Sequence, residues 1–340
     1  MIQKKFIRCA LISTVALGLC AVIGVSCFRD SISKEESLSE TGLFVMDTYC
    51  TISLEDGQAS AVSQLLYELE DSLSSFDAES DVSHLNSGGT LAAGSAAGDI
   101  IGRTLKLQEQ YRGHVDITSG ALVQLWGITT DSPRVPEEQE RKAALDTIGA
   151  AHVSISGGEI SLDPGTQIDL GAVAKGYALD RAAELLREQG VSCGKISMTS
   201  SMLLYGEKPE GAPFTVAIRS PDGEGTLGTV TTDSCFLSTS GGYERFFTAE
   251  DGQTYSHILD PESGYPAETD LTTVTVFCDS GLLSDYLSTL IYMGGTASLE
   301  EHLHAETYKI VAADTAGRLY VSEGLDFVQT SEESGLEEMK

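Results

Sequence analysis

The chain has 340 residues, 41% of them hydrophobic, so it can bury a full core as one large domain or two small ones. It carries 21 Lys+Arg against 51 Asp+Glu, and a formal net charge of -30 argues against binding nucleic acid through a basic face. An acidic protein that binds a phosphate must neutralise charge locally, with a metal ion, a helix N-terminus or a lone lysine.

The N-terminus has the pattern of a secretory signal. Three basic residues precede an apolar run over residues 9–25, and a small residue, Ser26, stands directly before Cys27. This pattern is typical of a signal peptide over residues 1–26, with Cys27 as the lipidated residue. An uncleaved N-terminal anchor is the alternative, although about 17 apolar residues are marginal for a spanning helix. We expect residues 27–42 to form a polar tether, with the protein lipid-anchored on the extracytoplasmic side of the cell membrane.

Hydrophobic periodicity predicts mixed α and β elements over residues 43–328. Helical spacing of apolar residues predicts helices over residues 59–76, 98–111, 173–189 and 282–293. Strand-like runs cover residues 43–54, 195–205, 214–219, 226–238 and 272–278, with a hairpin over 153–162 and a strand pair over 308–322. The acidic segment 329–340 favours a disordered tail.

The cysteines after the signal indicate no metal or redox motif. No CxxC pair occurs in the sequence, which argues against a zinc ribbon or a redox pair. Cys235 and Cys278 stand in apolar stretches, where buried free thiols are the simpler interpretation.

The stretch IDLGAVAKGYALD, residues 168–180, places a single lysine among small residues at the start of an expected helix. It is not a Walker loop, because no hydroxyl residue follows Lys175 to hold magnesium. Helix-terminal N–H groups and the helix dipole favour an anion at such a position, and the lysine adds a positive charge. A lysine at a helix start can equally be solvated, so this stretch alone leaves both interpretations open.

Two further stretches combine polar side chains with tight turns. HVDITSGALVQLWG, residues 114–127, sets Asp116 and Thr118 before a turn of small residues. STSGGYERFF, residues 238–247, forms another turn rich in hydroxyls and glycines. Ordinary turn chemistry would explain either stretch alone.

Candidate ligands for a cation and a candidate base come later in the chain. LLSDYLSTLIYMGG, residues 282–295, sets Asp285 and Thr289 four residues apart, hence on one face of a helix. A carboxylate and a hydroxyl there can bind a hard cation such as Mg²⁺. YSHILDPESGYP, residues 255–266, holds His257 beside a Pro/Gly turn, and a buried histidine with satisfied hydrogen bonds is the alternative interpretation.

In this order and spacing, the stretches resemble the ApbE-type flavin transferase family over most of residues 43–325. VMDTYC (45–50) and SSFDAESDVSHLN (74–86) complete the set, and IDLGAVAKGYALD is close to the family's signature. The resemblance implies an α+β fold, with a single large domain of mixed sheets packed with helices.

The resemblance also implies an activity, FAD:protein FMN transfer. Such an enzyme binds FAD with Mg²⁺, cleaves the pyrophosphate, and passes the FMN phosphoryl group to a threonine or serine hydroxyl of an acceptor flavoprotein, with AMP as the leaving group. Two alternatives remain open for the same chain. One is an FAD pyrophosphatase with water as acceptor, and the other is a non-catalytic flavin-binding lipoprotein.

The metal ligands implied by the resemblance are Asp285, Thr289 and a backbone carbonyl. That carbonyl belongs to Ala174, with Ala172 as the second candidate. Mg²⁺ bound there would face the pyrophosphate of FAD.

Two residues carry implied catalytic roles. Lys175 would neutralise charge on the pyrophosphate in the transition state, and His257 would assist the acceptor hydroxyl. Asp260 would support the loop that carries His257. The implied flavin or ribose contacts are Met46, Phe76, Asp116, Thr118, Lys175, Asp180, His257 and Ile258.

The chain departs from the family pattern after KISMT. The family usually has two glycines followed by an acidic residue, close to the flavin, whereas this chain has Ser200, Ser201 and Met202. Two Cβ atoms at these positions would obstruct close backbone approach to a ligand.

Overall fold

The computed structural model describes residues 38–55, 57–243, 245–250, 252–330 and 338–339. The expected signal peptide, Cys27 and the first part of the expected tether lie outside these residues. Within the described part of the chain, no helix combines the length and apolar character needed to cross a bilayer.

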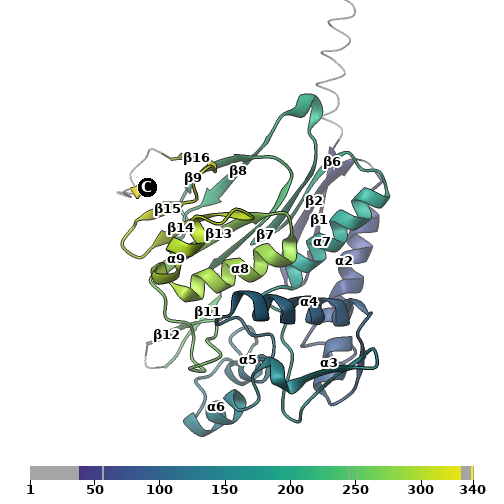
Figure 1. Ribbon diagram of the computed structural model, residues 1–340, viewed down its shortest axis with the longest axis vertical. Helices are drawn as coiled ribbons and strands as arrows, with labels where there is room; N and C mark the ends of the chain where they lie inside the picture. The colour runs from purple at the N-terminus through teal and green to yellow at the C-terminus, as the bar shows by residue number, and fades with distance from the viewer. Residues whose placement is uncertain (1–37, 56, 244, 251, 331–337, 340) are drawn as a thin grey trace, which may run out of the picture.

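A nine-stranded sheet forms the centre of the fold (Figure 1). The strand order is β1-β2-β6-β7-β10-β13-β14-β15-β17, and neighbours are antiparallel except β15 and β17. The bounds are β1 Leu38–Val45, β2 Thr48–Glu55, β6 Cys193–Met198, β7 Ser201–Gly206, β10 Cys235–Gly241, β13 Leu271–Cys278, β14 Tyr308–Asp314, β15 Leu319–Val321 and β17 Glu338–Met339.

Three smaller sheets complete the β structure. They have the orders β16-β9-β8, β3-β5-β4 and β11-β12. Their bounds are β3 Leu91–Ala92, β4 Val153–Ser156, β5 Glu159–Leu162, β8 Phe214–Arg219, β9 Thr226–Thr232, β11 Phe246–Thr248, β12 Thr254–Ser256 and β16 Asp326–Gln329.

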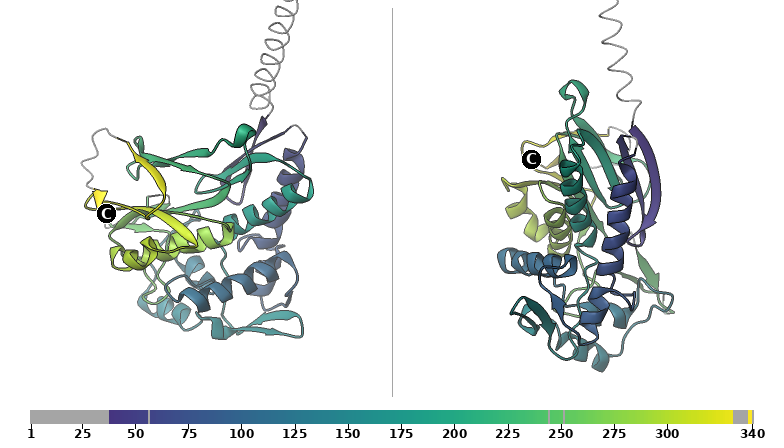
Figure 2. Two further views of the ribbon diagram at one scale, coloured as in Figure 1. Left: turned by 45° about the horizontal axis from the view of Figure 1, so that its top comes forward. Right: turned by 90° about the vertical axis from the view of Figure 1, so that its right-hand side faces the viewer.

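The helices pack against one face of the large sheet and extend beyond its end (Figures 1 and 2). Helices α3 to α6 lie at the end of the molecule away from β8 and β9. The bounds are α2 Ala59–Leu73, α3 Asp81–Asn86, α4 Ala96–Tyr111, α5 Gly120–Trp126, α6 Glu138–Leu145, α7 Ala174–Glu188, α8 Gly281–Gly294 and α9 Thr296–Leu303, with 3-10 turns at Ala150–His152 and Pro209–Gly211.

The large sheet is buried on both faces, because alternate residues of its central strands enter different cores. Phe236 of β10 packs into the core shared with the helices, whereas Leu237 packs into the core shared with the β16-β9-β8 sheet. Val276 and Phe277 of β13 divide in the same way. This alternation follows from the two-residue period of a strand.

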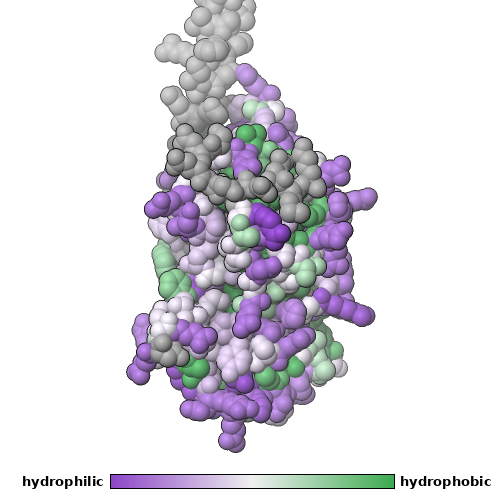
Figure 3. All heavy atoms as spheres, turned by 90° about the vertical axis from the view of Figure 1, so that its left-hand side faces the viewer, coloured by the Kyte–Doolittle hydropathy of each residue, from purple (hydrophilic) through white to green (hydrophobic). Residues whose placement is uncertain are grey.

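A third, smaller core lies under the loops that carry the candidate motifs. Trp126 is fully buried there, and its indole N–H donates to the carbonyl of Gly264 at 2.9 Å. Phe247 and Tyr255, from β11 and β12, pack against the same ring. The stretches 114–127 and 255–266 are therefore neighbours in space. Away from these cores, the surface drawn in Figure 3 consists mainly of hydrophilic residues.

The predicted α+β fold is confirmed, and most predicted elements exist. Helices α2, α4, α7 and α8, the hairpin β4–β5 and strand β8 correspond to predicted segments. Helices α3, α5, α6 and α9 and the short strands β3, β11, β12, β16 and β17 were not predicted.

Several predicted boundaries are wrong. The expected strand over 43–54 is two strands that turn at Met46–Asp47, and the expected strand 195–205 is also a hairpin. The expected strand 226–238 is two strands of different sheets, β9 in the three-stranded sheet and β10 in the large one. Strand β1 begins inside the expected tether, at Leu38. In the expected disordered tail, Glu338–Met339 pairs with β15.

Candidate active site

The stretch IDLGAVAKGYALD forms a tight loop that leads into α7, as predicted. Helix α7 begins at Ala174, its N-cap residue Val173 makes no side-chain cap, and its first turn contains no acidic residue. Lys175 is the second residue of the helix and is partly buried. Among the described residues its ammonium group has no hydrogen-bond or ion-pair partner. The lysine charge at the start of α7 is thus open to an anion.

Two distant side chains hold the loop before α7. The amide of Asn86 accepts from the N–H of Ile168 at 2.7 Å and donates to the carbonyl of the same residue at 2.9 Å. Ser75 donates to Asp169 at 2.9 Å, and the other oxygen of Asp169 accepts from the N–H of Gly171. The stretch 74–86 therefore positions the loop that carries Lys175.

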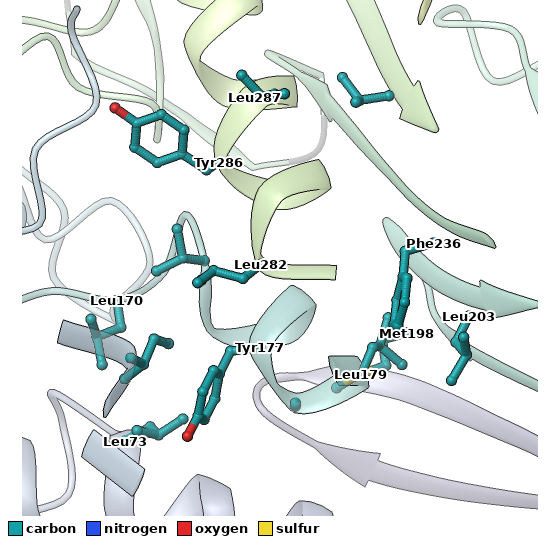
Figure 4. Close-up of a cluster of buried hydrophobic side chains, with 14 of the residues drawn as sticks. Leu73, Leu170, Tyr177, Leu179, Met198, Leu203, Phe236, Leu282, Tyr286 and Leu287 are labelled. Atoms are coloured by element: carbon teal, nitrogen blue, oxygen red, sulfur yellow. The ribbon is translucent and has the colours of Figure 1, made fainter. Parts of the chain in front are cut away.

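Helices α7 and α8 cross in direct backbone contact. A Cβ atom on Gly176 would overlap the carbonyl oxygen of Gly281 and lie 2.8 Å from Cβ of Asp285. A Cβ on Gly281 would overlap the carbonyl of Gly176 in turn. Only glycine at both positions permits this approach. Figure 4 shows the apolar side chains around the crossing, with Tyr177 of α7 and Leu282 of α8 among them.

The crossing brings Asp285 onto the first turn of α7. The carboxylate is 5% exposed. Its Oδ2 accepts from the N–H of Gly176 at 2.7 Å, and its Oδ1 accepts from the hydroxyl of Ser201 at 2.8 Å. One turn further along α8, Thr289 lies 3.0 Å from the hydroxyl oxygen of Ser240.

These residues fit a hard cation in kind. The oxygen atoms near α7 that could bind a metal are one carboxylate and several neutral oxygens. Mg²⁺ prefers ligands of this type when it also keeps waters and substrate phosphates. The described residues hold no cluster of three or more His, Cys, Asp or Glu side chains, so a cation bound here would take its other ligands from neutral oxygens, water and substrate.

The backbone distinguishes the two candidate carbonyls. In a regular helix the N–H of Gly176 would donate to the carbonyl of Ala172, but here it donates to Asp285. No other backbone N–H of the described residues donates to Ala172. The carbonyl of Ala174 lies inside α7, where the N–H of Ala178 is its regular partner. This pattern favours Ala172 over Ala174, which the sequence had placed first.

His257 lies close to the positively charged side chains of Arg245 and Lys175, and its imidazole stays neutral. Its Nδ1 is 3.1 Å from the carbonyl of Arg245, which can only accept, so Nδ1 carries the proton and Nε2 keeps a free lone pair. Loss of solvation is the largest cause that lowers the pKa of His257, to about 4, and the charges of Arg245 and Lys175 lower it further. The backbone hydrogen bond opposes the shift. The imidazole is therefore an uncharged acceptor at neutral pH.

The turn between β1 and β2 is tied to the same region. Met46 and Asp47 both have positive φ, and the N–H of Met46 donates to Glu70 at 2.6 Å. The guanidinium of Arg245 donates to the carboxylate and to the carbonyl of Asp47, each at 2.7 Å. Since the Arg245 carbonyl accepts from His257, Met46 and His257 belong to one connected region.

Two predicted ligand contacts have other roles in the structure. Thr118 is fully buried, and its hydroxyl donates to Asp116 and accepts from the N–H of Gly149. Asp180 accepts from the first N–H groups of α8 and from Arg103, the latter at 2.8 Å. Thr118 is fully buried and Asp180 is 9% exposed, so both make structural contacts, and their predicted contacts with a flavin or ribose stay predictions.

The remaining predicted residues surround the site at different depths. Asp116 is partly exposed and keeps one oxygen without a partner among the described residues. Phe76 is 59% exposed, one residue after Ser75. Ile258 is buried, and its carbonyl accepts from the N–H of Ala267. Their contacts with a flavin stay predictions.

Asp260 supports the loop after His257, as predicted. Its carboxylate accepts from the N–H groups of Glu262 and Ser263, and Oδ1 lies 3.2 Å from Nδ1 of His114. These bonds close the Pro/Gly turn and join it to the start of the stretch 114–127.

Sequence reasoning missed Ser201 as part of this site. It had treated Ser200 and Ser201 only as obstacles to a ligand. Ser201 is the first residue of β7, is 1% exposed, and donates to the Asp285 carboxylate. The two residues are 84 positions apart, and no local pattern relates them.

Known proteins match this chain in sequence. The profile of the ApbE family matches residues 46–312. The FAD:protein FMN transferase of Treponema pallidum is 30% identical and aligns over 83% of this chain and 85% of its own length. That of Vibrio cholerae is 31% identical over 68% of this chain and 72% of the relative.

Solved structures show the same fold. The ApbE protein of Thermotoga maritima superposes with a TM-score of 0.76 at 26% identity, over 84% of this chain and 97% of that one. The flavin transferase ApbE of Vibrio cholerae superposes with a TM-score of 0.71 at 26% identity, over 86% and 98%. With the family profile spanning both α7 and α8, this chain belongs to the ApbE family.

Proposed function

We propose that the protein is an FAD:protein FMN transferase. The observation that carries the proposal is the meeting of three groups at the start of α7: an unpaired lysine, a neutral histidine and a buried carboxylate. The curated relatives with this name match the same part of the chain. The acceptor is a flavoprotein with a threonine or serine hydroxyl.

The reaction is a substitution at phosphorus. The acceptor hydroxyl oxygen forms a bond to the FMN-side phosphorus of FAD, the bond from that phosphorus to the bridging oxygen breaks, and AMP leaves. Nε2 of His257 takes the hydroxyl proton, because its lone pair is free and the ring is uncharged at neutral pH. Lys175 and the N-terminus of α7 stabilise the charge that develops on the phosphate oxygens.

Mg²⁺ fits the same proposal as a cofactor. Asp285, Thr289 and the carbonyl of Ala172 would hold it, and Ala174 is the less suitable carbonyl. The ion supplies positive charge to the pyrophosphate of FAD when it is bound. The carbonyl of Ala172, which receives no backbone N–H, supports this assignment.

One assay tests the function against its alternatives. The purified full chain is mixed with FAD, Mg²⁺ and an acceptor flavoprotein that carries a threonine site. We expect fluorescent, FMN-bearing acceptor on a denaturing gel, together with AMP. Free FMN and AMP without labelled acceptor would establish a pyrophosphatase instead. Intact bound FAD would establish a non-catalytic flavin-binding protein.

We also propose that Cys27 is lipidated and anchors the protein at the extracytoplasmic side of the cell membrane. The basic start, the apolar run and Ser26 before Cys27 support this. Cys27→Ser should release the protein from the membrane fraction. Full retention of that variant would instead indicate an uncleaved N-terminal anchor.

A further inference from the structure

The carboxylate of Asp285 is held at both oxygens by groups from two other elements. The N–H of Gly176 on α7 lies 2.7 Å from Oδ2, and the hydroxyl of Ser201 on β7 lies 2.8 Å from Oδ1. Asp285 is 5% exposed and Ser201 is 1% exposed. Both hydrogen bonds are therefore shielded from solvent, and neither can exchange easily with water.

The two donors leave the carboxylate able to bind a cation. Each carboxylate oxygen has about two acceptor sites, so one site remains on each oxygen after these hydrogen bonds. Together the donors prevent rotation of the carboxylate about its own axis. A donor on only one oxygen would leave that rotation less restricted.

Ser238 shows that a buried serine next to Ser201 need not reach Asp285. Ser238 on β10 is the register partner of Ser201 on β7, and it is fully buried. Its hydroxyl lies 2.9 Å from that of Ser284 on α8. Two adjacent serines of the sheet thus contact adjacent residues of α8, and only Ser201 donates to the carboxylate.

We propose that Ser201 is a positioning residue, which orients Asp285 for a divalent cation. The inference rests on the proposed function, since it concerns the same site. A hydrogen-bond donor behind a metal ligand fixes the ligand's orientation before the metal arrives, and loss of such a donor typically weakens metal binding about 10–100-fold. Ser201 acts through Asp285 and need not contact the substrate.

The test measures cation binding directly. Mn²⁺ is titrated into the full chain in the presence of ADP, a pyrophosphate without a flavin to transfer, and free Mn²⁺ is followed by electron paramagnetic resonance. We expect Ser201→Ala to raise the Mn²⁺ dissociation constant about 10–100-fold. Ser238→Ala is the matched control and should leave that constant unchanged, while both variants stay folded with a lowered melting temperature.

A second variant keeps the test valid if Ser201→Ala does not fold. Ser201→Cys keeps a side chain of similar shape with a weaker donor, so its dissociation constant should lie between those of the wild type and Ser201→Ala. An unchanged constant in a folded Ser201 variant would overturn the inference. Equal weakening by Ser238→Ala would also overturn it, because the effect would then be a general loosening of α8 against the sheet.

FMN transfer by the wild type is measured in parallel and separates the two proposals. If the wild type transfers FMN and binds Mn²⁺, an unchanged constant in Ser201→Ala refutes the positioning role alone. If the wild type neither binds Mn²⁺ nor transfers FMN, the proposed function fails and the positioning role fails with it.

Discussion

Replacement of Gly176 by alanine should damage the fold and the site together. The new Cβ would lie 2.8 Å from Cβ of Asp285 and would overlap the backbone carbonyl of Gly281. Neither obstacle is the end of a flexible side chain, so α7 and α8 must move apart. The new Cβ would lie only 2.0 Å from the Gly281 carbonyl oxygen, so restoring an ordinary contact of 3.4 Å requires a shift of about 1.4 Å, which would lengthen the 2.7 Å bond from Gly176 to Asp285 to about 4.1 Å. That is outside the usual range for such bonds.

The energetic balance is unfavourable for this variant. Alanine gains about 1 kcal/mol over glycine in a helix interior. Overpacking costs about 1–3 kcal/mol, and loss of a hydrogen bond to a charged group costs about 1.5–3 kcal/mol. We therefore expect a net loss of about 1.5–5 kcal/mol, and a melting temperature lower by roughly 3–10 °C.

The control is Gly102→Ala. Gly102 also lies in a helix, α4, without a positive φ, and a Cβ there would meet nothing within 4 Å. It should stabilise the protein by up to about 1 kcal/mol. Differential scanning calorimetry measures both variants, and FMN transfer measures the site. A Gly176→Ala protein as stable and as active as the wild type would refute the proposed role of the helix crossing.

Three further predictions concern the chemical groups. Lys175→Met keeps most of the side-chain stem and should slow FMN transfer about 100-fold or more with an unchanged melting temperature, so a large loss of stability would contradict a role in charge neutralisation. Asp285→Asn can keep both hydrogen bonds, because a serine hydroxyl also accepts, yet it removes the carboxylate charge. The Mg²⁺ concentration for half-maximal transfer should therefore rise at least tenfold. An unchanged Mg²⁺ requirement would remove Asp285 from the metal site. His257 has a folded-state pKa of about 4, below the ordinary 6.5, so kcat/KM should stay level as pH falls from 8 to about 5, whereas a decline centred near 6.5 would contradict the burial argument. By linkage, this residue should lower the stability of the fold as pH falls from 6.5 towards 4, since the unfolded chain binds the proton first.

Sequence patterns located the long elements because periodicity reports burial. The stripe of apolar residues in 59–76 predicted α2, and the stretch 173–189 predicted α7 within one residue at each end. The turns at Met46–Asp47 and at Thr199 were not predicted, because neither contains a glycine. Met46, Asp47 and Thr199 adopt positive φ values of 50, 58 and 57 degrees, a conformation that a sequence reader assigns to glycine or asparagine.

The site was only partly predictable, because a polar side chain suited to a ligand also suits a helix end. Asp180 was expected to contact the flavin or ribose, yet it accepts from the N-terminus of α8, about 100 residues later in the chain. The reverse holds for Ser201, which was expected to obstruct a ligand, yet its hydroxyl donates to the carboxylate of Asp285. Both outcomes depend on pairings between distant segments, which composition and spacing do not encode.

The helix ends themselves explain why the lone lysine is useful at α7. Two helices begin near the crossing, and each has a positive end that could attract an anion. At α8, Asp180 and Ser280 accept the first N–H groups, so that end is already neutralised by the protein. At α7, the N-cap residue Val173 makes no side-chain cap, Asp285 accepts from the N–H of Gly176, and Lys175 adds a positive charge. In a chain with a net charge of -30, this unpaired lysine supports the proposed binding of the pyrophosphate at α7 rather than at α8. Asp285 lies at the same place through its bond to Gly176, so the proposed pyrophosphate would lie beside a carboxylate, and the proposed cation would offset the repulsion between the two.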